Sequence, residues 1–303
     1  MPKTLPSLDD LLEKTSRTFA LSIPVLPEPT RREVMIAYLL FRIADTFEDA
    51  AHWTPEARIA ALAEFKELLT ATGRPKAEAL ARDWVARQVA HHAGYQELMA
   101  ETPFVLDAFL GLSPEAIPPI RLHVSRSADG MASIVARTRA GSLTLHSIQE
   151  LKDYCYLVAG IVGEMLTELF LLGRPALAGI APFLRERAAT FGEALQLVNI
   201  LKDSASDAKE GRRYLPAEVP IGEVFALARR DLGVAGEYIA ALQRAEAPRG
   251  LIEFTALPVN LAWAALERVE KSGPGSKVSR PEVFLITQRL KRALDRGEPA
   301  APR

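Results

Sequence analysis

The feature that most constrains this chain is the spacing of its apolar residues, which recur at steps of three and four over most of its length. That spacing places apolar side chains on one face of an α-helix, whereas no stretch keeps the period of two that a half-buried strand needs. Breaks that contain glycine and proline, such as residues 72–75 and 272–275, separate the periodic segments. We therefore expect ten helices, among them residues 29–51, 95–110 and 147–172.

Length and composition narrow the class of protein. The chain has 303 residues, of which 49% are hydrophobic, so it can bury a large core. No glycine- or serine-rich linker divides it, which predicts one all-α domain over residues 1–303 with its motifs within about 15–290. A net charge of -1 lacks the basic excess that a dedicated nucleic-acid binder needs. The lone cysteine, Cys155, excludes an internal disulfide framework and fits a reducing cytosol.

The most apolar window, residues 154–173, is about long enough to cross a bilayer. Glu164 and Glu168 lie inside it on one helical face, and a lipid-exposed carboxylate costs roughly 2.5–3.5 kcal/mol. We therefore expect a core helix of a soluble protein and no transmembrane segment. The chain opens without the apolar core of a signal peptide and closes on polar, proline-rich residues 296–303, so neither a signal peptide nor a C-terminal anchor is expected.

The first segment with chemical information is residues 38–50, which read Tyr-Leu-Leu-Phe-Arg-Ile-Ala-Asp-Thr-Phe-Glu-Asp-Ala. Asp45 and Asp49 are four residues apart, so both carboxylates project from one face of the expected helix, with Glu48 beside them. Carboxylates this close repel one another and need a compensating cation. Arg42 can be that cation in an ordinary helix-surface ion pair, and a bound metal ion is the alternative.

A second segment, residues 196–216, repeats the arrangement. Asn199, Asp203 and Asp207 form a polar stripe at four-residue steps on an otherwise apolar helix. Two helices that each present a pair of carboxylates can form a clamp of oxygen ligands, which suits Mg²⁺. The five histidines are scattered and no glycine-rich phosphate loop is present, so a zinc site and a nucleotide triphosphatase are unsupported.

Basic residues accompany both acidic segments. Arg17 precedes the first segment within the stretch at residues 16–19, and Arg42 lies inside that segment. Lys202 and Arg212 flank the second acidic pair. Carboxylates that hold Mg²⁺ beside guanidinium and ammonium groups make a suitable receptor for a diphosphate, because the cations neutralise its oxygens.

These segments together resemble the squalene/phytoene synthase family, the all-α enzymes that join two isoprenyl diphosphates head to head. Four stretches carry the resemblance in the family's order, with a weaker fifth near the end: residues 16–19, 38–50, 154–163, 199–216 and 277–280. The resemblance implies an isoprenoid-synthase helical bundle around a central apolar cavity. It also implies that the two Asp-rich helices face each other across the mouth of that cavity.

The resemblance implies roles for individual residues. Metal ligation would fall to Asp45, Glu48, Asp49, Asn199, Asp203 and Asp207. Substrate binding would fall to Ser16, Arg17, Phe19, Tyr38, Arg42, Gln196, Asn199, Lys202 and Arg212. Catalysis would fall to Asp45, Asp49, Tyr154, Asp203 and Asp207. Tyr154 would stabilise a cation or handle a proton, and a plain core tyrosine with a satisfied hydroxyl is the alternative.

The implied function is the Mg²⁺-dependent condensation of two farnesyl diphosphates, through presqualene diphosphate, to squalene, with NADPH as the reductant. Family alternatives are a phytoene synthase acting on geranylgeranyl diphosphate, a dehydrosqualene synthase and a presqualene diphosphate synthase. Outside catalysis, the alternatives are an assembly subunit that binds a prenyl diphosphate and a helical scaffold with surface ion pairs. Ser206 stands where the family often has Glu, and Lys202 where it commonly has Arg, which leaves open which diphosphate is held more tightly. We expect a cytoplasmic protein, with peripheral membrane contact suggested by the apolar product.

Overall fold

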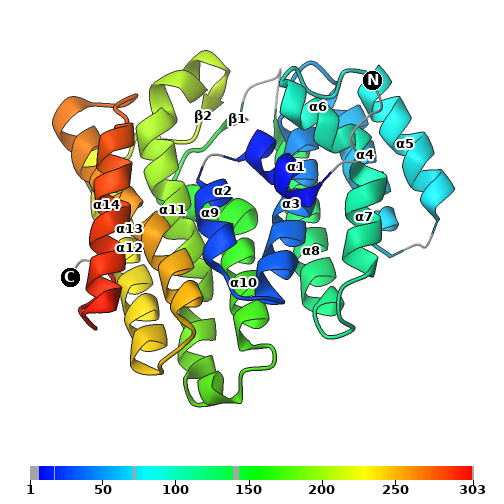
Figure 1. Cartoon of the computed structure of the whole chain (residues 1–303). Coiled ribbons are helices and arrows are strands. Elements are labelled where there is room, and N and C mark those ends of the chain that lie inside the picture. The colour runs from blue at the N-terminus through cyan, green and yellow to red at the C-terminus, as the bar shows by residue number, and fades with distance from the viewer. Residues whose placement is uncertain (1–6, 17, 71–72, 139–142, 302–303) are drawn as a thin grey trace. The chain divides into compact units, whose positions relative to one another are not determined.

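The computed structural model describes residues 7–16, 18–70, 73–138 and 143–301, and helices make up nearly all of its regular structure (Figure 1). The prediction of an all-α fold is confirmed. The chain divides into two compact units, an N-terminal unit with residues 1–24 and 28–138, and a C-terminal unit with residues 25–27 and 139–303. The prediction of one domain over the whole chain therefore stays a prediction.

The N-terminal unit is built around the long helix α3, which packs against α4, α7 and α8. In chain order the elements up to residue 138 are α1 (Leu8–Thr15), α2 (Phe19–Ser22), the 3₁₀ turn η1 (Ile23–Val25), α3 (Thr30–Glu48), α4 (Pro55–Leu68), α5 (Arg74–Ala86), α6 (Ala93–Ala100), α7 (Thr102–Leu110) and α8 (Ile117–Arg137). The C-terminal end of α3 lies in an aromatic cluster, where the Phe47 ring is 4.7 Å from that of Trp84 and 6.3 Å from that of Phe65. This cluster fixes the helix end that carries the first acidic segment.

One expected helix, residues 95–110, is two helices in the structure. Helix α6 ends at Ala100 and α7 begins at Thr102, with Pro103 in its first turn. Proline lacks an amide donor and disfavours helical geometry in the residue before it. Pro103 therefore accounts for the break that apolar spacing alone did not predict.

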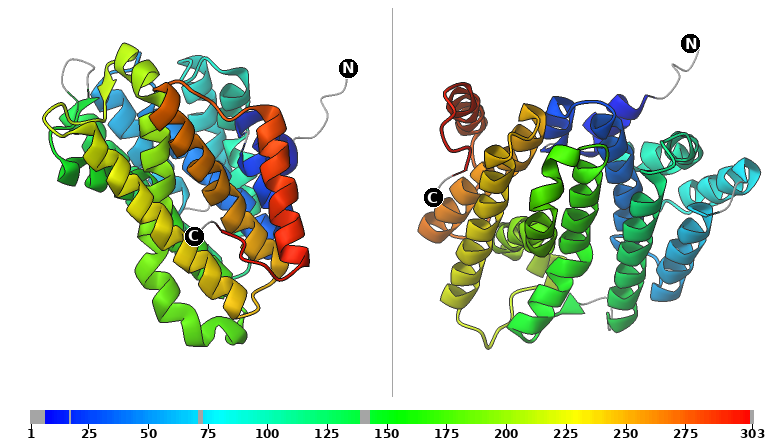
Figure 2. Two further views of the ribbon diagram at one scale, coloured as in Figure 1. Left: turned by 90° about the vertical axis from the view of Figure 1, so that its left-hand side faces the viewer. Right: turned by 90° about the horizontal axis from the view of Figure 1, so that it is seen from below.

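The C-terminal unit contains six α-helices of its own among the described residues. Its elements are β1 (Leu143–Thr144), α9 (Ile148–Cys155), the π-helical turn η2 (Tyr156–Gly160), α10 (Ile161–Leu171), the 3₁₀ turn η3 (Pro175–Ile180), α11 (Ala181–Lys209), β2 (Arg212–Arg213), α12 (Ile221–Arg244), α13 (Arg249–Ser272) and α14 (Arg280–Asp295). Strands β1 and β2 form a short parallel pair with Leu143 opposite Arg212. Helix α13 packs between α12 and α14, the yellow, orange and red helices of Figure 2.

The expected helix at residues 147–172 contains the π-helical turn η2, which the apolar spacing did not predict. Around it, the backbones of α10 and α11 approach closely. A Cβ at Gly163 would lie 2.0 Å from the carbonyl oxygen of Ala188, and one at Gly192 would lie 2.0 Å from that of Ala159. Only glycine permits such an approach, so these two positions allow α11 to pack directly on the η2–α10 segment.

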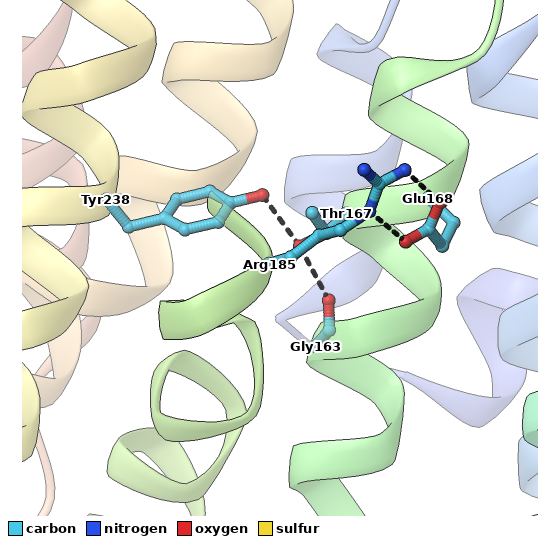
Figure 3. Close-up of polar contacts among 5 residues, drawn as sticks. All are labelled: Gly163, Thr167, Glu168, Arg185 and Tyr238. Carbon is cyan, nitrogen blue, oxygen red and sulfur yellow. Dashed lines mark hydrogen bonds and ion pairs between the residues drawn. The ribbon is translucent and has the colours of Figure 1, made fainter. Parts of the chain in front are cut away.

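Side-chain contacts complete the packing of α10 (Figure 3). The Thr167 hydroxyl donates to the carbonyl oxygen of Gly163 at 2.9 Å and lies 2.9 Å from the Tyr238 hydroxyl of α12. The Arg185 guanidinium of α11 donates two hydrogen bonds, at 2.7 and 2.9 Å, to the Glu168 carboxylate. Helix α10 is thus tied to both α11 and α12 by polar contacts.

Among the described residues, one helical stretch, Ile148–Leu171, is long and apolar enough by composition to cross a membrane. Half of its most apolar window is buried inside the protein. Two of its carboxylates, Glu164 and Glu168, are engaged within the C-terminal unit, since Glu168 pairs with Arg185 and Glu164 accepts a hydrogen bond from the Tyr156 hydroxyl at 3.2 Å. These contacts favour the expected core helix.

Candidate functional site

The first acidic segment occupies the C-terminal turn of α3. Asp45 and Glu48 lie in that turn and are half-buried, whereas Asp49 follows as the exposed C-cap residue. The Asp49 amide donates to the Asp45 carbonyl oxygen at 2.8 Å, so helical geometry continues through all three residues. The spacing therefore sets their carboxylates around one helix end, as the sequence predicts.

Arg42 lies one turn before these acids and pairs with the first of them. Its Nη1 is 3.3 Å from Oδ2 of Asp45. The guanidinium also lies 5.6 Å from the ring centroid of Tyr38 and 5.5 Å from that of Tyr95 on α6. Two aromatic faces around one guanidinium restrict its position and favour its charge. The ion pair expected for Arg42 is present, and it is held by side chains from two helices.

The predicted segment before α3 joins this group. The Ser16 hydroxyl accepts a hydrogen bond from the Phe19 amide at 2.9 Å, which shapes the turn between α1 and α2. The Phe19 ring is 5.4 Å from the Tyr38 ring, and the Tyr38 hydroxyl donates to the carbonyl oxygen of Thr15 at 2.8 Å. The structure therefore brings these predicted residues together with Arg42. Arg17 lies outside the described residues.

The acidity of Asp45 in the α3 turn is perturbed by its surroundings. Burial, opposed by the Arg42 guanidinium and reinforced by the negative charge of Asp49, raises the pKa of Asp45 to about 6. Its side chain retains 31% exposure, so a ligand from solution can reach it. A partly buried carboxylate on a turn that carries two further carboxylates offers hard oxygen donors, which fit Mg²⁺.

The second acidic segment lies near the C-terminal end of α11. Lys202 Nζ donates to Oδ1 of Asn199 at 3.1 Å and is 3.2 Å from Oδ2 of Asp203. The Asn199 side chain is exposed, and those of Gln196 and Asp207 are half-buried. The predicted stripe is thus present along one side of α11, with its lysine bridging two of its members.

Arg212 follows that stripe on strand β2. The Leu143 amide of β1 donates to the carbonyl oxygen of Gly211 at 3.1 Å, which fixes the backbone beside Arg212. The Arg212 side chain forms an ion pair with Glu210. Tyr154 on α9 is buried and its ring lies 4.6 Å from the ring of Tyr214. This burial agrees with a core tyrosine as well as with a catalytic one, so its role stays a prediction.

A complete metal centre from protein ligands alone is not formed: the described residues hold no group of three or more His, Cys, Asp or Glu side chains close enough together to bind a metal ion. Magnesium does not need such a centre. It is commonly bound through one or two carboxylates, and waters and phosphate oxygens complete its six positions. The acidic turns of α3 and α11 each offer that many carboxylates.

Three contacts at these turns were not predicted from the sequence. Tyr95 faces Arg42, Arg58 donates from Nε to the carbonyl oxygen of Phe47 at 3.2 Å, and the Gly275 amide donates to the carbonyl oxygen of Lys202 at 2.7 Å. The sequence does point to Arg58, because this charged residue occupies the first position of an otherwise apolar stripe, residues 58, 61, 62 and 65 on α4. We recognise no feature of the sequence that points to Tyr95 or Gly275.

Comparison with known proteins relates this chain to one protein family. The family model described as "Squalene/phytoene synthase" matches residues 12–220. A squalene synthase from Eremothecium gossypii is 32% identical over 212 residues, which are 69% of this chain and 45% of that relative. The Botryococcus squalene synthase from Botryococcus braunii is 30% identical over 212 residues, 69% of this chain and 42% of that protein. The chain thus spans under half the length of these curated relatives.

Two solved structures share the fold. One, described as TcSQS in complex with the ligand BPH1237, has a TM-score of 0.72 at 23% identity and covers 96% of this chain and 88% of that chain. The other, a dehydrosqualene synthase in complex with a ligand, has a TM-score of 0.62 at 20% identity and covers 95% of each chain. With a family match that spans both acidic segments, the chain belongs to the squalene/phytoene synthase family.

Proposed function

We propose that this chain is a Mg²⁺-dependent prenyltransferase that joins two molecules of farnesyl diphosphate head to head, through presqualene diphosphate, to squalene. The relatives named squalene synthases support this choice within the family. The observation that carries it is the α3 turn, where Asp45, with its raised pKa, lies beside Asp49 and pairs with a guanidinium held between two aromatic rings. Hard oxygen ligands next to a fixed cation suit a metal-bound diphosphate.

In this proposal both acidic turns act on the diphosphate of an allylic substrate. Bound Mg²⁺ would stabilise the negative charge that develops on the departing diphosphate. Asp45, Asp49, Asp203 and Asp207 would hold the metal ions. Arg42 would orient the diphosphate oxygens and offset their charge, because a guanidinium matches phosphate geometry with two parallel donors.

The carbon chemistry would take place against apolar walls. After the C–O bond breaks, the allylic cation must be kept from water until the double bond of the second chain attacks it. Residues 143–172 supply apolar side chains for that purpose. Tyr154, buried beside Tyr214, would act on the cation in the later rearrangement. NADPH, where the product is squalene, would be a co-substrate that supplies hydride to the final cation.

The apolar product also bears on location. We propose a cytoplasmic protein that releases product to a membrane surface through peripheral contact. Sedimentation of the purified protein with and without phospholipid vesicles would test this location, and a pelleted fraction that vesicles do not increase would contradict it.

Product analysis tests the function itself. Purified protein is incubated with farnesyl or geranylgeranyl diphosphate, with and without Mg²⁺ and with and without NADPH, and products are extracted. Squalene from farnesyl diphosphate, dependent on both Mg²⁺ and NADPH, is the expected result. Phytoene from the longer substrate, or dehydrosqualene or presqualene diphosphate despite NADPH, would identify the corresponding family alternative. No release of diphosphate from either substrate would favour a non-catalytic subunit.

A further inference from the structure

The α3 turn carries its negative charges at an unfavourable place. The C-terminal end of a helix bears a partial negative charge, so carboxylates there are repelled and cations are favoured. Helix α3 ends with Asp45, Glu48 and the C-cap residue Asp49, and its last turn contains no basic residue. Arg42, one turn earlier, pairs with Asp45, and a cation from a neighbouring element would add to the stabilisation of this helix end.

Arg58 supplies a cation from the neighbouring helix α4. Its side chain is buried, with the residue 8% exposed, and its Nε donates to the carbonyl oxygen of Phe47 at 3.2 Å. Phe47 directly precedes Glu48, and its carbonyl is among the last four of the helix, which lack regular partners within it. The guanidinium thus meets the backbone of the turn that carries the three carboxylates.

Further contacts also hold the same turn. The Phe47 ring packs edge-on against Trp84 at 4.7 Å, so the ring is fixed in the aromatic cluster while the carbonyl is fixed by Arg58. The Thr46 hydroxyl donates to the carbonyl oxygen of Arg42 at 2.7 Å, which secures the preceding turn. The backbone between Arg42 and Asp49 is therefore fixed before any ligand binds.

An apolar residue would serve packing better than Arg58. Burying a guanidinium costs desolvation energy, and the next positions of the same stripe on α4 are Ala61, Leu62 and Phe65. We propose that Arg58 is a positioning residue for the metal-binding turn of α3, which it serves by holding the Phe47 carbonyl and offsetting the charge at the helix end. This inference rests on the proposed function of that turn.

The test compares Arg58→Met, which removes charge and donors, with Arg58→Lys, which keeps the charge. Calorimetry measures Mg²⁺ binding in the presence of inorganic diphosphate. Arg58→Met should weaken Mg²⁺ binding by about 10–100-fold, the usual effect of losing a partner that orients metal ligands, and Arg58→Lys should recover part of the loss. In metal-free protein, amide hydrogen exchange at residues 45–50 should be faster in Arg58→Met than in the unmodified chain.

Leu62→Ala is the matched control, because Leu62 is buried one turn further along α4. It should lower the melting temperature but leave Mg²⁺ binding and the exchange of residues 45–50 unchanged. An equal effect of Leu62→Ala, unchanged Mg²⁺ binding and exchange in folded Arg58→Met, or tighter Mg²⁺ binding in Arg58→Met would each overturn the proposal. If Arg58→Met does not fold, Arg58→Lys is compared with Leu62→Ala by the same measurements.

The two proposals fail in different ways. If the unmodified chain binds no Mg²⁺ with diphosphate, the proposed function fails, and the metal-free exchange at residues 45–50 still decides whether Arg58 positions the turn. If the unmodified chain binds Mg²⁺, and Arg58→Met binds it equally well with unchanged exchange at residues 45–50, the metal site of the proposed function stands and Arg58 has no positioning role.

Discussion

The acidic turns of α3 and α11 have the same spacing of carboxylates and similar exposure, but different surroundings. The Arg42–Asp45 pair has side chains 25% and 31% exposed, and the Lys202–Asp203 pair 25% and 39%. Arg42 is held by Tyr95 from α6, and the α3 backbone by Arg58 from α4. Lys202 instead contacts Asn199 and Asp203 of its own helix.

The two acidic turns differ in what holds their basic side chains in place. At the α3 turn the cations are fixed by packing against other helices, and the last turn of α3 itself has no basic residue. In α11 the last turn contains Lys209, and Lys202 lies between the two stripe members it contacts. Equal sequence spacing can therefore produce one turn that is fixed before the ligand arrives and one whose side chains can adapt to it.

The largest expected effect is on turnover. Asp45→Asn should lower Mg²⁺-dependent diphosphate release by about 10³-fold and Asp203→Asn by about 10²-fold, within the range for losing one group that stabilises a transition state. Asp45 should matter more because its surroundings cannot rearrange to compensate. Diphosphate release from farnesyl diphosphate measures both variants.

Asp129→Asn is the control for these variants, because Asp129 is an exposed acid of α8 that bonds Lys66. It should leave turnover unchanged. Full activity in either motif variant would remove that turn from the metal site, and a larger loss in Asp203→Asn would reverse the comparison between the turns.

Tyr154 extends the comparison to the carbon chemistry. Tyr154→Phe keeps the ring that packs 4.6 Å from Tyr214 and removes only the hydroxyl. The first ionisation should continue while the later rearrangement slows by about 10²–10⁴-fold, the usual contribution of one proton-handling group. Presqualene diphosphate should accumulate in product extracts. A lower melting temperature with an unchanged product ratio would support the core-tyrosine alternative.

Much of the geometry within each acidic turn was predictable from the sequence because it depends on spacing within single helices. Asp45 and Asp49 are four residues apart, and Arg42 is three residues before Asp45, so helical geometry alone predicts their shared face and the ion pair. The stripe that contains Asn199 and Asp203 follows from the same argument. The all-α fold is likewise a consequence of apolar spacing.

The contacts around the two turns that were not predictable join segments distant in sequence. Nothing in apolar spacing says that Tyr95 faces Arg42 or that Gly275 bonds the carbonyl of Lys202. The π-helical turn at residues 156–160 keeps the apolar pattern of an α-helix, so the pattern cannot show it. Convergence of the two turns on one diphosphate stays a prediction.

A smaller effect concerns stability without metal. Because the folded pKa of Asp45 is about 6, above the value near 3.9 in an unfolded chain, the folded state binds the proton more tightly. The contribution of Asp45 to stability therefore decreases as pH rises from about 4 to 6. Asp45→Asn removes this term and should stabilise metal-free protein at pH 7 by about 1–2 kcal/mol, less than the full shift implies because the side chain is partly solvated.

Urea unfolding at pH 4 and pH 7 in the presence of EDTA measures this difference. Glu193 and Asp231 also have raised pKa values, chiefly through burial, but they are present in both proteins and cancel in the comparison. A variant that is less stable than the original at pH 7 would show that Arg42 compensates Asp45 fully without a metal ion.

The smallest effect is expected for Lys202→Ala, and comparing it with Arg42→Ala separates the cations of the two turns. Lys202→Ala should change the free energy of unfolding by less than about 0.5 kcal/mol, as is usual for a solvated ion pair. Arg42→Ala should cost about 1–3 kcal/mol, because it removes an ion pair together with stacking on Tyr38 and Tyr95. Since both ion pairs are similarly exposed, urea unfolding of the two variants isolates the aromatic contacts. Equal losses would mean that packing around Arg42 adds nothing, and that the α3 turn is no more fixed than the α11 turn.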